Sequence, residues 1–266
     1  MKELLKIEWL KLKGYRTFWV LSALFIISIF GINYFVYYVK QLTVNTAPPV
    51  NAIVGTPFSF PNVWHTVSYF SSFLLVIPGL MIITSITNEF TYKTSRQNII
   101  DGWSRTDFIK VKMTLLVLLA AISTLIVFIT SIIFGFISAS SFTFEKIEYV
   151  GFFFIQAISY SMLALLISLF IKRSGLAIGI FFLYSFIIEN MLGAFINFAT
   201  GRIDVRTGPG NFLPLNSVDS LIPFPLFRNI IDLGTSTSRW ILLAVAILYL
   251  LFYAAISFRK YSKADL

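Results

Sequence analysis

Long stretches with few or no charged residues divide the chain into six apolar segments. Each provides at least 19 residues, and a helix needs about 20 mostly apolar residues to cross the roughly 30 Å of hydrocarbon in a bilayer. Continuous apolar runs of this length contradict an outer-membrane barrel, whose strands alternate apolar and polar residues. We predict one all-α integral membrane domain over residues 1–266, with six transmembrane helices at residues 17–39, 63–87, 113–139, 149–171, 174–200 and 240–258.

Two segments outside these spans are apolar enough to suggest contact with the membrane. Leu5, Trp9 and Leu12 share one face of residues 1–14, which predicts an N-terminal helix in the membrane interface; a basic segment that only fixes the topology is the alternative. Residues 202–238 hold four prolines among apolar residues. This segment is too apolar for a solvated loop and too broken for a span, so we predict an outer capping or re-entrant segment of short helices, with a plain folded loop as the alternative.

The distribution of cations orients the helices. Of the 21 Lys and Arg residues, 15 lie on the side that holds both termini, the connection between spans two and three and the turn between spans four and five, and six lie on the other side. Because cytoplasmic loops carry the excess of Lys and Arg, both termini are predicted to be cytoplasmic. The net charge of +9 is thus explained by membrane topology and by a cytoplasmic surface on which another protein can dock. It gives no support for nucleic acid as a partner.

Composition excludes most catalytic chemistry. Hydrophobic residues make up 57% and charged residues 12%, whereas a soluble domain carries roughly 25% charge. The chain has no Cys and one His, which excludes thiolate metal sites and makes a His-rich metal centre implausible. No phosphate-binding loop, HExxH or GxSxG motif is present, so we expect no enzyme activity and no ATP binding on this chain.

The connection between spans two and three predicts a cytoplasmic helix over residues 88–102. Asn88 is a suitable cap, Glu89 suits the positive end of the helix dipole, and Gly102 can end the helix. The apolar residues Phe90, Tyr92, Ile99 and Ile100 lie among Lys93, Arg96 and Gln97. Such a mixture fits a groove on another protein better than free solvent.

At this point the sequence resembles the permease subunits of type-2 ABC exporters, particularly the small six-span proteins of bacteriocin, lantibiotic and bacitracin self-protection. The resemblance covers the whole chain. It rests on the basic start with Trp9-Leu-Lys-Leu-Lys13, on Pro78, on Glu89-Phe90, on Thr94-x-Arg96, on Ile99-Ile100 and on Trp103-Ser-Arg105.

The resemblance implies a coupling helix at residues 88–102 that lies in a groove of a separate ABC ATP-binding subunit. Family members commonly have Gly where this chain has Lys93, which leaves the start of the helix open. ATP and Mg²⁺ would bind to the partner subunit, with no cofactor on this chain, and a second permease copy would complete a homodimer or heterodimer in the lipid bilayer. The implied contact residues for the ATPase are Glu89, Tyr92, Thr94 and Arg96.

The implied function is ATP-driven export across the bacterial cytoplasmic membrane. The substrate would be hydrophobic or amphipathic, such as an antimicrobial peptide, an antibiotic or a lipid-like molecule. An ion-coupled secondary transporter is one alternative, although it would need a midplane ion site and usually an internal repeat. A membrane anchor that transmits ATPase motion to an extracytoplasmic machine, without transport, is another.

Two pairs of residues inside the spans are candidates for functional roles. Pro78 removes a backbone hydrogen bond and precedes Gly79, which predicts either a plain bend or a gating hinge. Glu189 lies within the fifth span, where a charge costs about 2.5 to 3.5 kcal/mol. Together with Asn190 it would line a substrate path or a helix interface, or it would make a packing hydrogen bond; a proton-coupling role is the least favoured.

Overall fold

All of the regular structure in the described residues is helical. The computed structural model describes residues 2–46, 55–94, 97, 104–201, 208–226 and 237–262. Six of the described helices are long and apolar enough to cross a membrane, which confirms the predicted number of spans. They are α2 (Arg16–Thr46), α4–η1–α5 (Asn62–Thr91), α7 (Arg105–Ile137), α8 (Glu148–Phe170), α9–η2–α10 (Ser174–Ala199) and α12 (Arg239–Ser262).

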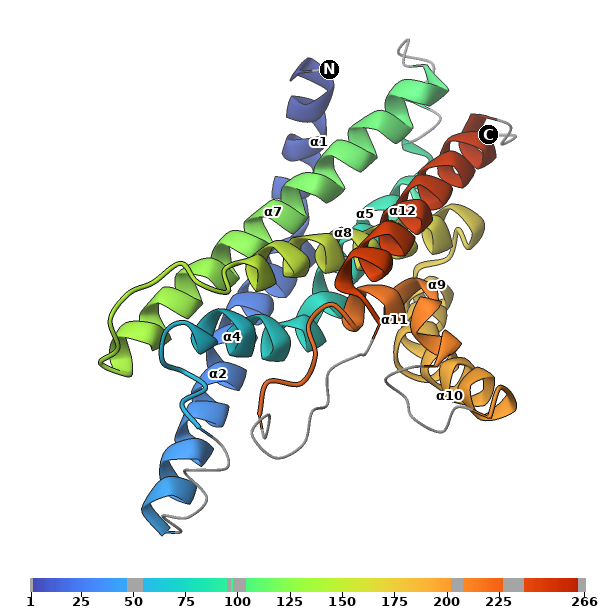
Figure 1. Ribbon diagram of the computed structural model, residues 1–266. Coiled ribbons are helices and arrows are strands. Elements are labelled where there is room, and N and C mark those ends of the chain that lie inside the picture. The colour runs from blue at the N-terminus through green and yellow to red at the C-terminus, as the bar shows by residue number, and fades with distance from the viewer. Residues whose placement is uncertain are drawn as a thin grey trace.

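Helix α8 lies at the centre of the bundle. In its most apolar window 67% of the residues are buried, against 17% in α2. The small residues Ala157, Ser161 and Ala164 are all buried, and small side chains let neighbouring helices approach closely where lipid supplies no hydrophobic driving force. In Figure 1 the two termini lie at one end of the bundle, and α10 and α11 (Pro214–Asp219) lie toward the other.

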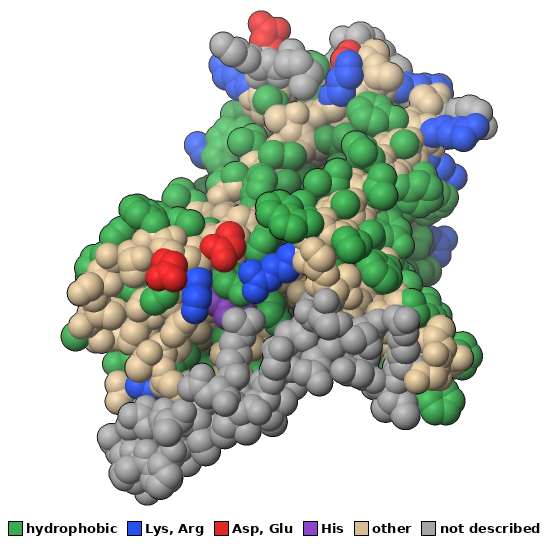
Figure 2. Space-filling model, viewed as in Figure 1, with side chains coloured by type: hydrophobic (Ala, Val, Ile, Leu, Met, Phe, Trp, Pro, Cys, Tyr) green, Lys and Arg blue, Asp and Glu red, His purple; other side chains and the backbone are tan. Residues whose placement is uncertain are grey.

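The surface of the bundle has the polarity of a protein embedded in lipid. Figure 2 shows hydrophobic side chains over the middle of the molecule, with Lys and Arg gathered around the end that carries the termini. Ile27, Phe195 and Leu248 are examples of large apolar side chains that are mostly exposed. An apolar surface this extensive suits contact with lipid tails or with another membrane chain.

Two of the six spans contain a turn that is not α-helical. Span two has a 3₁₀ turn, η1 (Phe73–Leu75), and span five has a π turn, η2 (Tyr184–Ile188). Pro78 has no N–H to bond the carbonyl four residues earlier, which lies inside η1, so the predicted irregularity falls one turn before the proline. A Cβ on Gly79 would lie 2.5 Å from the ring of Phe181. Gly79 therefore allows span five to pack closely against span two.

The connection after span two corrects one sequence prediction. The predicted helix start at Asn88 is wrong, because α5 (Val76–Thr91) continues through this residue. The break comes at Lys93, whose φ of 57° is the left-handed conformation that glycine adopts most easily. The resemblance to type-2 ABC permeases implies Gly at this position. Beyond Thr94, most of the predicted coupling helix at residues 88–102 lies outside the described residues.

Helix α7 begins well before the apolar run at Met113. Ser104 caps it: its hydroxyl accepts a hydrogen bond from the backbone N–H of Asp107 at 3.0 Å, as expected for a serine at a helix start. As a result Lys112 lies inside a helix, although the sequence placed it at the edge of the membrane span.

The described part of the outer segment, residues 208–226, contains two short helices, η3 (Pro209–Phe212) and α11. Helix α10 (Glu189–Ala199) packs against η3 backbone to backbone. A Cβ on Gly210 would lie 2.8 Å from the Cα of Gly193. The N–H of Gly210 donates to Oδ1 of Asn197 at 2.8 Å. This contact holds the outer segment against span five.

The contact at Gly210 predicts a specific sensitivity to substitution. Gly210→Ala should lower the thermal unfolding midpoint of the detergent-solubilised protein, because one added carbon in a rigid contact costs about 1–3 kcal/mol. Gly179→Ala is the matched control, since nothing lies within 4 Å of a Cβ at Gly179. Equal midpoints for the two variants would contradict the contact.

Candidate functional site

Four charged side chains from three helices meet near the end of the bundle that carries the termini. Nζ of Lys112 in α7 lies 2.5 Å from Oε2 of Glu8 and 2.8 Å from Oε1 of Glu89. Nζ of Lys11 lies 3.1 Å from Oε1 of Glu8 and 3.2 Å from Oε1 of Glu89. Glu8 and Lys11 belong to α1 (Lys2–Gly14), and Glu89 lies in the last turn of α5. We call these four residues the charge cluster.

The charge cluster is balanced and deeply buried. The side chains of Glu8, Glu89 and Lys112 are at most 2% exposed. Burial alone would raise the pKa of Glu8, but Lys112 and Lys11 outweigh burial and hold this pKa below its ordinary value. Removing one member of such a buried pair leaves an uncompensated charge, at a cost of about 3–5 kcal/mol. The cluster therefore fastens α1 to the ends of α5 and α7.

Aromatic packing connects the charge cluster to the last span. Nζ of Lys112 lies 5.4 Å from the centre of the Phe108 ring. That ring stacks on Tyr261 of α12 with a centroid distance of 4.4 Å and an interplanar angle of 7°. The C-terminal helix is thus packed against the same end of α7 that holds the cluster.

The residues implied as ATPase contacts divide between the charge cluster and the surface. Glu89 faces this chain's own lysines, so it would have to leave the cluster to bind a separate subunit. The side chain of Tyr92 is 68% exposed, and that of Thr94 is half-buried. Arg96 lies outside the described residues. The role of these four residues as contacts stays a prediction, and Tyr92 is the member that the described surface presents outward.

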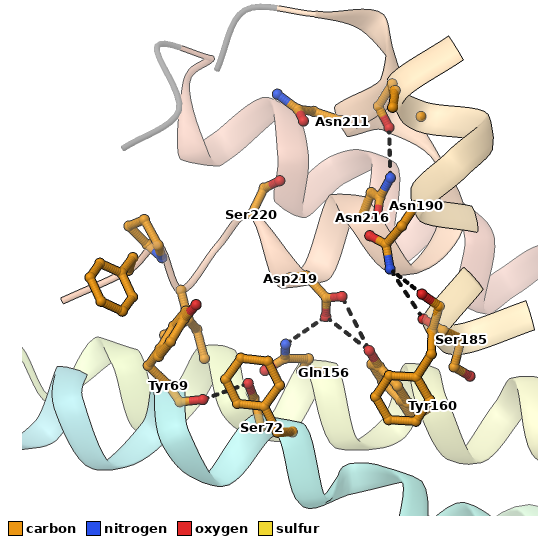
Figure 3. Close-up of a pocket in the computed structure, with 18 of the residues that line it drawn as sticks. Tyr69, Ser72, Gln156, Tyr160, Ser185, Asn190, Asn211, Asn216, Asp219 and Ser220 are labelled. Atoms are coloured by element: carbon orange, nitrogen blue, oxygen red, sulfur yellow. Dashed lines mark hydrogen bonds between the residues drawn. The ribbon is translucent and has the colours of Figure 1, made fainter. Parts of the chain in front are cut away.

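A cavity of about 490 Å³ lies toward the other end of the bundle. Figure 3 shows α8 along its floor and α11 above it. Both non-α turns contribute to its wall, with Phe73 from η1 and with Ser185 and Phe186 from η2. The irregular turns of spans two and five therefore meet at one cavity, and such turns are frequent at functional sites.

Asp219 at the end of α11 is the central polar residue of this cavity, which we call the Asp219 pocket. Oδ1 of Asp219 accepts from Nε2 of Gln156 at 2.6 Å, and Oδ2 accepts from the hydroxyl of Tyr160 at 3.1 Å (Figure 3). Burial raises the pKa of Asp219 to about 7, opposed by these two hydrogen bonds and aided by the charge of Glu189. None of the described lining residues is Lys, Arg or His.

Glu189 does not line the Asp219 pocket, but it binds α11, which does. Its Oε1 accepts the backbone N–H groups of Leu215 at 2.5 Å and Asn216 at 2.8 Å. These groups belong to the first turn of α11, where N–H groups have no partner within the helix and a negative charge is favourable. The contact corresponds to the packing hydrogen bond among the alternatives for Glu189, and a role in a substrate path stays a prediction.

Asn190 follows Glu189 and lies against the π turn. Its Nδ2 donates to the carbonyl of Phe186 at 3.1 Å, and the residue lines the Asp219 pocket (Figure 3). Pro78 and Gly79 are both buried next to η1. Whether they act as a hinge stays a prediction.

Sequence reasoning missed the central residues of both sites. Of the apolar face expected on α1, Leu12 is buried while Trp9 is 49% exposed, and Glu8 turns inward instead. The predicted span at residues 113–139 leaves Lys112 just outside it, and the predicted outer segment at residues 202–238 includes Asp219 without singling it out. For Lys112 the available signal was a charge directly before a long apolar run. Across the described part of the chain, no group of three or more His, Cys, Asp or Glu side chains could hold a metal ion.

The charge cluster predicts that Lys112 is needed for stability. Lys112→Met should lower the thermal unfolding midpoint markedly, because Glu8 and Glu89 would remain buried without their main cation; the expected cost is about 3–5 kcal/mol. Lys110→Met on the exposed side of α7 is the control. A midpoint as high as that of the control would refute a stabilising cluster.

Asp219 predicts a pH dependence of stability. Its pKa of about 7 in the folded protein exceeds the ordinary 3.8, so it stabilises the fold most below pH 4 and loses this contribution as the pH rises through 7. The unfolding midpoint of the wild type should therefore fall relative to that of Asp219→Asn between about pH 4 and 7.5. Glu148→Gln, at an exposed carboxylate, should track the wild type. A constant difference between wild type and Asp219→Asn would contradict the raised pKa.

Comparison with known families agrees with this architecture. The sequence model described as "ABC-2 family transporter protein" matches residues 4–188, which is more than half of the chain and includes the charge cluster. No curated protein matches the sequence. The match ends just before Glu189, so the outer segment and α12 lie beyond it. The chain therefore belongs to the ABC-2 family of transporters, as a multi-pass membrane permease that carries no ATPase activity itself.

Proposed function

We propose that the chain is the membrane-spanning permease subunit of a bacterial exporter powered by ATP. The family implies an ATP-binding subunit as partner, and ATP and Mg²⁺ would bind there. The end that carries both termini faces the cytoplasm, in keeping with the 15 cations assigned to that side. Two permease copies and two ATP-binding subunits would form the working unit in the cytoplasmic membrane.

The observation that supports this function best is the position of the charge cluster. Glu89 lies just before the connection at residues 92–104, and Lys112 lies shortly after it. Their ion pair joins the two ends of the connection, and Glu8 adds α1 to the same unit. A force that the ATP-binding subunit applies to the connection would move three helices together.

The irregular turns supply places where the spans can bend in response. The turns η1 and η2 interrupt spans two and five, and Pro78 with Gly79 follows η1 directly. Closure of the ATP-binding subunits would push on the coupling segment, residues 88–102, and bend these spans between inward-open and outward-open arrangements. In this mechanism Pro78 and Gly79 act as the hinge.

A second permease copy would cover part of the exposed apolar surface. Gly175 and Gly179 near the start of α9 (Ser174–Leu183) have open space where a Cβ would be, and a small-xxx-small pattern lets another helix approach closely. The apolar walls suit a hydrophobic or amphipathic substrate, such as an antimicrobial peptide, an antibiotic or a lipid-like molecule. Export of such a molecule would protect the cell that makes or meets it.

The coupling contact can be tested by substituting two of the implied contact residues. Tyr92→Ala and Arg96→Ala, combined, should reduce co-purification of the ATP-binding subunit and lower substrate-stimulated ATP hydrolysis about ten-fold, since buried aromatic and Arg side chains dominate binding at interfaces. Arg259→Ala removes an exposed cation near the C-terminus, on the same side, and should leave both values unchanged.

Three outcomes would overturn the proposed function. Normal co-purification and normal ATP hydrolysis in the double variant would contradict the proposed coupling contact. Transport that persists without the ATP-binding subunit, and that Glu189→Gln abolishes, would favour an ion-coupled secondary transporter. A tight ATPase complex with no transport of any tested amphiphile would favour a membrane anchor.

A further inference from the structure

We propose that the Asp219 pocket binds the primary ammonium group of an amphiphile, with Asp219 and Gln156 accepting its hydrogen bonds. This inference rests on the proposed function in one respect, namely that the amphiphile is cargo. The pocket lies within one copy of the chain, between the outer segment and spans two, four and five.

The first argument is a surplus of hydrogen-bond acceptors. Nε2 of Gln156 donates to Asp219, which leaves Oε1 of Gln156 as an acceptor, and this buried atom has no partner. The side chain of Gln156 is only 2% exposed, and Figure 3 places it beside Asp219 in the pocket. The hydroxyl oxygen of Ser185, also buried, is another polar atom without a partner. A buried acceptor left unpaired costs free energy, so a donor-rich ligand would be stabilised here.

The second argument is charge. Asp219 is hydrogen-bonded to a neutral amide and a neutral phenol, and no cation is found among the described residues that line the pocket. Glu189 lies close enough to add its negative charge to the same region. An ammonium group brings one positive charge and three donors, which complements one carboxylate and the neighbouring amide oxygen. A phosphate-bearing head group would meet the carboxylate of Asp219 and no described cation.

The third argument is the aromatic wall. Tyr69 packs edge-to-face against Phe73 and against Phe224, each with a centroid distance of 5.4 Å. All three rings line the pocket, together with Tyr160 and Phe186. A cation within about 6 Å of an aromatic face is attracted to it, most strongly where water is excluded. The wall therefore favours an ammonium group over a neutral hydroxyl of the same size.

The rim of the pocket accounts for the apolar part of the ligand. Phe73 and Phe186 line the pocket and are also about half exposed on the bundle surface. An alkyl chain attached to the ammonium group can lie across these rings and continue into lipid. A volume of about 490 Å³ holds a head group with a short length of chain, which indicates a small amphiphile or one end of a larger molecule.

Photo-cross-linking tests this assignment. The full chain, in complex with its ATP-binding subunit in lipid nanodiscs, is irradiated with a diazirine derivative of n-decylamine or of n-decanol, and labelled peptides are identified by mass spectrometry. In the wild type, both probes should label the peptides that contain Tyr69 and Tyr160. The amine should reach the same labelling at a concentration about ten-fold lower than the alcohol, as expected for charge-assisted hydrogen bonds. Asp219→Asn should remove this preference.

Controls separate the pocket from general effects of charge and folding. Glu148→Gln removes an exposed carboxylate and should keep the preference for the amine. Unfolding midpoints establish that Asp219→Asn is folded, and Gln156→Leu should weaken amine labelling while leaving alcohol labelling unchanged. Competition by unlabelled decylamine but not by phosphatidylethanolamine would identify a phosphate-free amine as the ligand, and competition by both would show that a membrane amino-lipid also enters.

The outcomes distinguish this inference from the proposed function. Equal labelling by amine and alcohol in the wild type, or an unchanged preference in a folded Asp219→Asn, would overturn the ammonium site while the ATPase complex stands. If amine labelling depends on Asp219 but the chain binds no ATP-binding subunit, the ammonium site is supported and the proposed exporter function is overturned.

Discussion

A charged side chain inside an apolar bundle must find a partner, because the bilayer and the packed helices supply no water to solvate it. At one end of this protein the partner of Lys112 is a pair of carboxylates from α1 and α5. At the other end, the partners of Glu189 are backbone N–H groups in the first turn of α11. These two solutions fasten the N-terminal helix and the outer segment to the bundle, so the elements outside the spans depend on buried charge for their positions.

The two ends are connected through helices that are not uniformly rigid. Span two runs from the pocket wall at η1 to the charge cluster at Glu89. Its 3₁₀ turn and the π turn of span five both line the same cavity. In the proposed mechanism, a motion imposed near Glu89 would reach the pocket along this span.

The six spans could be predicted from the sequence because the thickness of the bilayer sets a minimum length of apolar residues for each span. The helix boundaries were harder. Ser104 caps the start of α7 by a local hydrogen bond, and α5 continues past Asn88 to Thr91, with Glu89 paired to Lys112 and Lys11. The cap at Ser104 is a local signal, but a prediction based on the length of apolar runs overlooks it. The pairing of Glu89 depends on residues far along the chain, which no local pattern contains.

The sequence by itself determined the membrane class, the number of helices and the bias of cations toward one side, since each follows from composition read along one dimension. Only the tertiary structure decided which charges are paired and which polar atoms are left open. Glu8, Glu89 and Lys112 meet from three helices, and Gln156 meets Asp219 across 63 positions. The physical reason is that pairing energy depends on distance and burial in three dimensions, and residues distant in sequence reach hydrogen-bonding distance only when the helices pack.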